Sequence, residues 1–241
     1  MGLRFDVITL FPEIIEGYCS CALLGRGIKN NIIELKTTNP RDFTHDKHRR
    51  VDDTPYGGSA GMVMMAPPVF EAYESIEKLP DSEFIMLTPQ GEPYNQKISK
   101  ELAQKNQIIL LCGRYEGFDE RIRTGLKPRE ISLGDYVLTG GELGALCIID
   151  SVSRHLHGFL GKDESAVDDS FSEGLKGLLE HPQYTKPREY RGMRVPDVLL
   201  NGNHQEIEKY RLNERIKRTK ERRADLWEKV KDKIKNEKEL W

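Results

Sequence analysis

Several features that define common protein classes are missing from this sequence of 241 residues. No apolar run approaches the roughly 20 residues needed to cross a bilayer, and the N-terminus does not resemble a signal peptide. The cysteines Cys19, Cys21, Cys112 and Cys147 form no C-x-x-C pair. These absences predict a cytoplasmic protein without membrane association, whose thiols are free and act mainly as small buried apolar groups.

Two nucleotide-binding signatures are also absent. The chain contains no G-x-x-x-x-G-K-[ST] segment and no G-x-G-x-x-G after its first predicted strand, which argues against a P-loop kinase and an ordinary Rossmann dehydrogenase. His45 and His48 are spaced as two metal ligands would be, but no third ligand is near and Arg49 and Arg50 follow directly. We therefore predict no metal-binding residues.

Two glycine-rich turns stand out within residues 108–150, and each follows a short apolar run. Runs of this length, rich in Ile and Leu and stopped by glycine, are typical of buried strands in a parallel sheet. The loops that leave such strands face the crevice where open α/β sheets bind ligands. The turns predict a pocket floored by main chain, although simple turns would look the same and the ligand stays open on this evidence.

The rest of the chain alternates between the two kinds of secondary structure, which predicts an α/β fold with a mostly parallel sheet. A long polar loop spans residues 39–60, and loops of this length are usually functional or disordered. Strands are expected at residues 3–11, 32–37, 83–88, 108–112, 130–133 and 136–138, and helices at 13–24, 67–78, 95–106 and 141–157.

A polar stretch without periodicity, residues 158–172, predicts a linker between a domain of residues 1–157 and a small all-helical domain of residues 173–241. Helices are expected at residues 205–223 and 224–238. The net charge is −2, yet residues 209–223 hold eight Lys or Arg against two Glu. Arg215, Arg218 and Arg222 would line one side of the first helix, as a surface that follows phosphates would, or as an ordinary solvated face.

A series of distinctive blocks runs through the chain in a fixed order. They are residues 5–12, 40–44, 51–58, 61–62, 87–91, 112–117, 134–138, 140–142, 150–154, 169–171 and 200–204. In this order the blocks closely resemble the bacterial tRNA (guanine-N1)-methyltransferase family of the SPOUT class, over nearly the whole chain. The resemblance implies that the N-terminal domain is tied in a deep trefoil knot, a rare exception among protein folds.

The resemblance also implies S-adenosyl-L-methionine as methyl donor and a homodimer whose active site is shared between subunits. The substrate would be the anticodon stem-loop of tRNA with guanosine immediately 3′ of the anticodon, at position 37. The product would be 1-methylguanosine, which helps to maintain the reading frame. The implied donor-binding residues are Leu87, Thr88, Pro89, Gln90, Gly113, Tyr115, Glu116, Gly117, Ser132, Leu133, Gly134, Asp135, Tyr136, Val137, Leu138, Gly140 and Gly141.

Two further residues receive catalytic roles from the same resemblance. N1 of guanine carries a proton and is a poor nucleophile until the proton leaves. Asp169 is expected to remove it as general base, while Arg154 stabilises negative charge on O6. From composition alone, a solvated linker carboxylate is the favoured interpretation of Asp169, and the catalytic role rests on the resemblance. The expected RNA contacts are Arg41, His45, Arg114, Arg215, Arg218 and Arg222.

The chain departs from the family pattern at two positions. Ser59 replaces a glycine usual in the Tyr-Gly-Gly turn, and Met86 replaces an aromatic residue found near the adenosine in some members. Magnesium is associated with activity in this family, but no dedicated ligand set is visible, so Mg²⁺ is left open. Two alternatives remain: a catalytically silent tRNA-binding module, and a SPOUT methyltransferase that acts at another RNA position.

Overall fold

The computed structural model describes residues 2–160, 170–172 and 174–238, apart from the side chains of residues 233 and 235–238. The predicted catalytic residue Asp169 lies outside the described residues. The chain divides into two compact units, residues 1–161 and 162–241. Among the described residues, no helix is long and apolar enough to cross a membrane.

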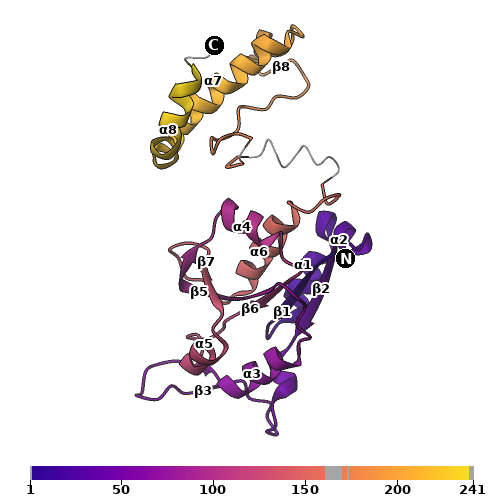
Figure 1. Cartoon of the computed structure of the whole chain (residues 1–241), viewed down its shortest axis with the longest axis vertical. Helices are drawn as coiled ribbons and strands as arrows, with labels where there is room; N and C mark the ends of the chain where they lie inside the picture. Colours follow the sequence, from indigo (N-terminus) through magenta and orange to yellow (C-terminus); the bar gives the residue numbers. More distant parts are fainter. Residues whose placement is uncertain (1, 161–169, 173, 239–241) are drawn as a thin grey trace. The chain divides into compact units, whose positions relative to one another are not determined.

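The first unit is built on a five-stranded sheet in the order β2-β1-β6-β5-β7, and every neighbouring pair is parallel (Figure 1). This confirms the predicted α/β fold with a mostly parallel sheet. The strands are β1 (Leu3–Ile8), β2 (Ile33–Thr38), β5 (Ser82–Pro93), β6 (Gln107–Leu111) and β7 (Arg129–Ser132). A separate antiparallel pair, β3 (Asp52–Asp53) and β4 (Val63–Met64), and a 3-10 turn at Pro40–Phe43 interrupt the long polar loop.

Helices cover both faces of this sheet (Figure 1). Alternate residues of β6 enter opposite cores, with Ile108 and Leu110 on one side and Ile109 and Leu111 on the other. Because both faces are buried, the strand is continuously apolar rather than alternating. The first core is covered by α1 (Pro12–Cys19), α2 (Ala22–Lys29), α4 (Gln96–Leu102) and α6 (Glu142–Ser153), the second by α3 (Ala66–Ser75) and α5 (Glu120–Leu126).

The single helix predicted at residues 13–24 is wrong, because the chain forms α1 and α2 with a break between them. Ser20 Oγ donates to the Gly17 carbonyl at 2.8 Å, and Cys21 is extended, with φ −102° and ψ 160°. Side-chain bonds of this kind compete with the helical ladder and favour a helix end. Apolar periodicity continues through the break and conceals it.

The strand predicted at residues 136–138 is also wrong, because this segment is an exposed loop. Gly134 has a φ of +145°, and its N–H donates to Ser132 Oγ at 3.3 Å. The Tyr136 N–H then donates back to the Gly134 carbonyl at 2.9 Å. These turn hydrogen bonds end β7 at Ser132. The apolar residues that follow are therefore exposed in a loop and do not pair in the sheet.

All four cysteines are free, as predicted. Cys19 and Cys112 are buried, whereas Cys21 and Cys147 are exposed, so only half of them act as buried apolar groups. Burial raises the pKa of the Cys19 thiol to about 11, with a further contribution from the charge of Asp150. A thiol with a raised pKa carries little reactive thiolate at neutral pH.

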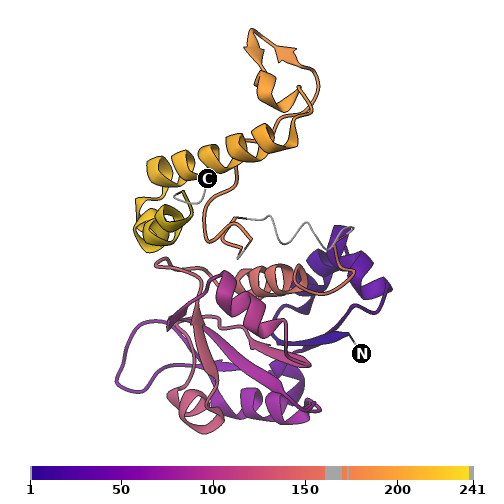
Figure 2. The same ribbon diagram turned by 45° about the horizontal axis from the view of Figure 1, so that its top comes forward.

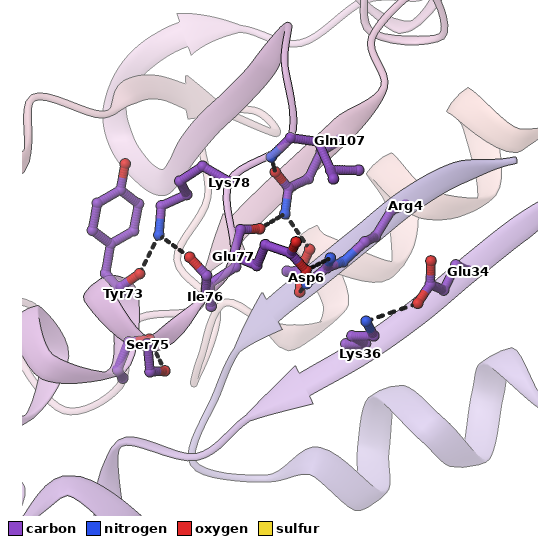
Figure 3. Close-up of polar contacts among 12 residues, drawn as sticks. Arg4, Asp6, Glu34, Lys36, Tyr73, Ser75, Ile76, Glu77, Lys78 and Gln107 are labelled. Atoms are coloured by element: carbon purple, nitrogen blue, oxygen red, sulfur yellow. Dashed lines mark hydrogen bonds and ion pairs between the residues drawn. The ribbon is translucent and has the colours of Figure 1, made fainter. Parts of the chain in front are cut away.

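A buried polar network lies on β1, on the face opposite the first core (Figure 3). Asp6 accepts from Arg4 at 2.8 Å and from Gln107 Nε2 at 2.7 Å. Gln107 Nε2 also donates to the Glu77 carbonyl at 3.0 Å, and its Oε1 accepts from the Leu79 N–H at 2.8 Å. The network ties the segment after α3 to the sheet and satisfies polar groups that burial would otherwise leave unpaired.

The second unit contains the predicted C-terminal helices, α7 (His204–Arg222) and α8 (Ala224–Lys238). Its small core gathers Leu178, Ile216, Val230 and Ile234, with Leu212 and Trp227 packed against them. A β-hairpin of β8 (Glu189–Tyr190) and β9 (Met193–Arg194), followed by a 3-10 turn (Asp197–Leu199), precedes α7 and was not predicted.

Candidate functional site

The ends of three neighbouring strands define the candidate site. The strands β6, β5 and β7 are adjacent and parallel, so their carboxyl ends meet at one edge of the sheet. Leu87 and Glu92 of β5 both pair with Ile131 of β7, so residues 88–91 leave the regular ladder as a bulge within β5. Thr88 of this bulge is half-buried, while Pro89 and Gln90 are exposed. The predicted donor-binding segments therefore leave the sheet at a common edge.

Two of these segments are in direct contact. The Gly141 N–H donates to the Gly113 carbonyl at 2.9 Å. A Cβ added to Gly141 would lie 2.8 Å from Cys112 Cα, closer than real side chains approach a backbone. Only glycine fits at this crossing, which gives a specific physical reason for one glycine of the Gly-Gly pair.

Leu87 of β5 and Leu133 after β7 both pack close to the first turn of α6. A Cβ on Gly144, in the first turn of α6, would lie 3.2 Å from Leu87 Cδ1 and 3.7 Å from Leu133 Cγ. Leu87 follows the buried part of β5 and Leu133 follows β7. The start of α6 thus supports all three predicted loops.

The turn after β6 is braced from another part of the chain. Tyr115 adopts a positive φ of 60° and Gly117 a φ of 119°. The Glu116 N–H donates to the Met62 carbonyl, and the Gly117 carbonyl accepts from the Met64 N–H, both at 2.9 Å. The segment around β4, which ends the long polar loop, therefore fixes the backbone of the turn.

The surface at this edge combines apolar side chains with carboxylates. The exposed fractions are 44% for Tyr115, 56% for Tyr136, 88% for Val137 and 41% for Leu138. Glu116 and Asp135 are also exposed. Large apolar side chains left in water near convergent main-chain groups are typical of a ligand site. This surface suits a ligand with a flat ring and a positive charge.

Arg114, predicted to contact RNA, is held within the protein by the buried carboxylate of Glu142. The Arg114 guanidinium pairs with Glu142 Oε2 at 2.8 Å, and Thr9 Oγ1 donates to Glu142 Oε1 at 2.7 Å. Arg114 also donates to the Thr139 carbonyl at 3.3 Å and lies 4.4 Å from the ring centre of Phe11. The contacts link both glycine loops to the end of β1, which gives Arg114 a structural role.

Of the two predicted catalytic residues, only Arg154 lies among the described residues. Arg154 caps the C-terminal end of α6, is half-buried, and its N–H bonds to the Asp150 carbonyl at 3.3 Å. The predicted partner Asp169 lies outside the described residues. The twelve residues of α6 separate Arg154 from the glycine loops by about 18 Å at 1.5 Å per residue. Arg154 therefore lies far from the predicted donor-binding loops of its own chain, whose common sheet edge is called the donor edge below.

The remaining predicted RNA contacts lie in both units. In the first unit, Arg41 donates to the Tyr115 hydroxyl at 3.4 Å, which places it beside the donor edge. His45 Nε2 lies 3.0 Å from a carboxylate oxygen of Glu71. In the second unit, Arg215, Arg218 and Arg222 follow one another along α7.

A cavity opens in the second unit beside α7. Arg218 and Arg222 line this cavity of about 460 Å³, together with Ser170 and Gln183. The Glu180 N–H donates to Ser170 Oγ at 3.1 Å and so helps to shape the wall. The lining also includes Leu179, Glu180 and His181, so the two guanidinium groups are the part of this cavity suited to an anion. Across residues 2–160, 170–172 and 174–238, no group of three metal-ligating side chains was found.

Glu142 and the β8–β9 hairpin were not predicted from the sequence. Glu142 appears in the sequence only as the residue after Gly140 and Gly141, with nothing to show that it would pair with Arg114 and with Thr9, 133 positions away. The hairpin does carry a signal, because Arg191 and Gly192 form a dipeptide suited to a tight turn between short runs.

Comparisons with known proteins identify the family of this chain. Residues 3–229 match the family model described as tRNA (Guanine-1)-methyltransferase TrmD. Among similar proteins, a tRNA (guanine-N(1)-)-methyltransferase of Synechococcus sp. (strain JA-2-3B'a(2-13)) is 54% identical over 224 residues, covering 93% of this chain and 88% of the relative. The enzyme of that name from Brevibacillus brevis is 52% identical, covering 95% and 93%. That from Dictyoglomus turgidum is 51% identical, covering 95% and 91%.

Proposed function

Because the chain belongs to the tRNA (guanine-1)-methyltransferase family and is an enzyme of that class, we propose that it methylates N1 of the guanosine immediately 3′ of the tRNA anticodon. The donor is S-adenosyl-L-methionine and the product is 1-methylguanosine, which supports maintenance of the reading frame. A tRNA substrate implies work in the cytoplasm. The observation that carries the proposal is the convergence of three glycine-bearing loops on the edge where β5, β6 and β7 end.

The side chains at this edge fit the proposed donor. Tyr115, Tyr136 and Val137 offer exposed apolar surface for an adenine ring and a thioether chain, and the carboxylates of Glu116 and Asp135 suit a cation. S-adenosyl-L-methionine supplies an electrophilic methyl group when bound. The trefoil knot of the family is proposed for this unit, supported by the tight crossing of Gly141 over Cys112.

The chemistry assigned to the chain's own residues is proton removal and charge stabilisation. Asp169 takes the N1 proton of guanine, and Arg154 stabilises the charge that gathers on O6 as N1 becomes nucleophilic. Guanine must be turned out of the anticodon loop to reach the loops at the sheet edge. Positioning of the two reactants supplies much of the acceleration, so neither side chain needs to be a strong catalyst.

A homodimer with a shared active site is proposed from two observations. Arg154 lies about one α6 length, roughly 18 Å, from the donor loops of its own chain. In addition, α1 and α6 leave an apolar face uncovered, with exposed fractions of 37% for Ile14, 52% for Tyr18 and 58% for Leu143. Pairing of this face with its copy is supported by symmetry, because an isologous interface needs one self-complementary patch.

The RNA partner is proposed to contact Arg41 beside the donor edge and the Arg218–Arg222 cavity of the second unit. His45 and Arg114 remain weaker candidates, because each already contacts a carboxylate, His45 that of Glu71 and Arg114 that of Glu142. Arg215 is a weaker candidate because it is not among the residues that line the cavity. Mg²⁺ stays an open component of the reaction. Adding a chelator to the assay below decides whether it is needed.

The deciding experiment measures methyl transfer from labelled S-adenosyl-L-methionine to two tRNA transcripts, one with G and one with A immediately 3′ of the anticodon. We expect labelling of the G transcript alone, with digestion to nucleosides yielding 1-methylguanosine. Asp169→Asn keeps the shape of the side chain and removes its basicity, so the rate should fall by about 100-fold or more. Arg154→Gln should lower the rate with little change in the Kd of the donor.

Each outcome separates one part of the proposal from the others. Equal labelling of both transcripts rejects the position, and a product methylated on ribose rejects the base as acceptor. Full activity of Asp169→Asn retains the enzyme and rejects this residue as base. Donor binding without transfer to any transcript favours a silent tRNA-binding module.

A further inference from the structure

The hairpin of β8 and β9 in the second unit exposes an apolar pair on a strongly basic segment. Tyr190 and Met193 face each other across the hairpin and are 57% and 66% exposed. Within residues 184–195 the cationic side chains are Lys186, Arg188, Arg191 and Arg194, against a single Glu189. Exposed apolar side chains surrounded by positive charge indicate a partner that is both flat and anionic.

The backbone of the hairpin fixes where its tip points. Arg191 and Gly192 occupy the two central positions of the turn with φ values of 53° and 75°. Positive φ at both positions is the requirement of a type I′ turn, whose twist matches that of the strands. The Val195 N–H donates to the Arg188 carbonyl at 2.9 Å, which extends the pairing beyond the strands. The tip is therefore a defined structure that presents Arg191.

The side chains divide into an internal pair and an available surface. Glu189 pairs with Arg194 across the hairpin at 3.3 Å, so the only acidic group of the segment is neutralised. The Arg191 guanidinium lies 5.2 Å from the ring centre of Tyr190. A guanidinium held over an aromatic ring keeps its N–H groups at the edge for phosphate and adds a planar surface on which a base can stack.

The hairpin is held on the rest of its unit, at a distance from the cavity of Arg218 and Arg222. Figure 2 shows it beyond the N-terminal end of α7, away from α8. Tyr184, just before the hairpin, shares a side-chain hydrogen bond with Tyr210 of α7. Arg218 lies fourteen residues along α7 from His204, about 21 Å. A ligand that reaches both places must be an extended polyanion.

We propose that this hairpin is a second RNA-contacting element, which binds backbone phosphate through Arg191 and Arg188 and stacks an unpaired base against Tyr190 and Met193. The inference rests on the proposed function for the identity of the RNA as tRNA. In this proposal the hairpin contributes to the affinity for tRNA, whereas the reacting guanosine binds at the proposed active site. Loss of the hairpin contacts therefore raises the Kd and KM for tRNA and leaves kcat unchanged.

The test uses the full-length protein and measures the Kd for a tRNA transcript by filter binding over a series of salt concentrations. Arg191→Gln should weaken binding several-fold and reduce the slope of log K against log salt by about 1. Tyr190→Ala should weaken binding about tenfold, the scale of one lost stacking contact. Tyr190→Phe keeps the ring and should bind as the wild type does. Lys229→Gln, an exposed lysine of α8, is the charge-matched control.

Thermal unfolding midpoints equal to that of the wild type exclude a folding defect in these surface variants. The proposal is overturned if Arg191→Gln and Tyr190→Ala both bind tRNA normally, or if Lys229→Gln loses as much affinity as they do. Dissociation of an oligomer without loss of RNA affinity also overturns it, because the hairpin would then contact protein. If only the hairpin proposal is wrong, the wild type still forms 1-methylguanosine. If the proposed function is wrong, the wild type does not form this product, and the binding experiment still measures whether the hairpin contacts RNA.

Discussion

Arg4 and Asp6 form an ion pair inside the first unit, with side-chain exposed fractions of 7% and 2% (Figure 3). The hydrogen bond to Asp6 raises the pKa of Arg4, so the arginine keeps its charge. Removing the buried partner of such a pair is costly because the remaining charge has little access to water. Without the Asp6 carboxylate, Arg4 would keep the longer contact of 3.7 Å with the exposed Glu77. The network with Gln107 adds bonds that hold the segment after α3.

We therefore expect Asp6→Asn to lower the free energy of unfolding by about 3–5 kcal/mol. The control lies in the same part of the structure, where Glu34 and Lys36 pair at 2.9 Å with both side chains 49% exposed. Glu34→Gln should change stability by less than about 0.5 kcal/mol, as surface pairs do. Urea unfolding of both variants measures the difference, and equal losses would mean that burial does not control the strength of the pair.

Gly141 is the residue whose substitution tests the donor edge most directly. An added methyl group would press on Cys112 Cα at 2.8 Å and on the Gly113 nitrogen at 2.9 Å. Overpacking of this kind costs about 1–3 kcal/mol, and separation of the two loops should weaken donor binding by tenfold or more. Isothermal titration with S-adenosyl-L-methionine measures the change.

Gly17→Ala provides the matched control for that substitution. A Cβ at Gly17 would meet nothing within 4 Å, and Gly17 lies inside α1. Alanine there should stabilise the protein by about 0.5–1 kcal/mol and leave donor affinity unchanged. If Gly141→Ala binds donor as Gly17→Ala does, the crossing of the loops is not part of the donor site.

At the scale of elements, α1 and α6 form a single surface. The Tyr18 hydroxyl donates to Asp150 Oδ2 at 3.2 Å, which joins the two helices beside the exposed Leu143 and Cys147. The negative charge of Asp150 raises the pKa of Tyr18, so the phenol remains a donor at neutral pH. Residues 143, 147 and 150 share one side of α6 because they are spaced by four and three.

A charged residue on this surface should prevent association of two copies. We expect Leu143→Arg to shift the protein from dimer to monomer in sedimentation velocity and to lose transfer activity, because a shared site needs both chains. Lys97→Glu, which reverses an exposed charge on α4, should leave both properties unchanged. A Leu143→Arg variant that stays dimeric would place the interface on another surface.

At the scale of the whole molecule, the proposed sharing of the active site predicts complementation between two inactive variants. Gly141→Ala disables the donor loops and Asp169→Asn disables the base, so each homodimer should be inactive. In a mixed dimer, the intact loops of one chain meet the intact Asp169 of the other. After equal amounts are mixed and allowed to exchange, activity should recover to about a quarter of the wild-type value, since half of the dimers are mixed and each has one intact site.

No recovery after demonstrated subunit exchange would mean that each chain uses its own Asp169. Mass spectrometry of differently tagged chains verifies the exchange. A mixture of Asp169→Asn with Arg154→Gln serves as the second arm of this experiment. If both residues of a site come from the same subunit, this mixture stays inactive, because every site then contains one altered residue. Recovery would mean that the two residues come from different subunits, since one site of the mixed dimer then has the intact pair.

The sequence by itself determined the fold class and the five strands of the parallel sheet, because burial of both faces of such a sheet leaves apolar runs that are visible locally. The start and end of α7 and α8 were also predictable to within a residue or so, since Asn203 accepts from the N–H groups of Gln205 and Glu206 and signals the start. The motif order determined the family. These are all properties of neighbouring residues.

Only the tertiary structure decided which distant residues meet. The pairing of Thr9 and Arg114 with Glu142 and the bulge of residues 88–91 depend on strand register and on side-chain contacts between distant residues. Burial of these polar groups is costly unless hydrogen bonds or ion pairs offset it, and the partners that supply those bonds lie far along the chain. Local periodicity carries no information about those partners. For this reason the sequence predicts that the glycine-rich loops lie at one sheet edge, whereas the contacts that support these loops could not be predicted.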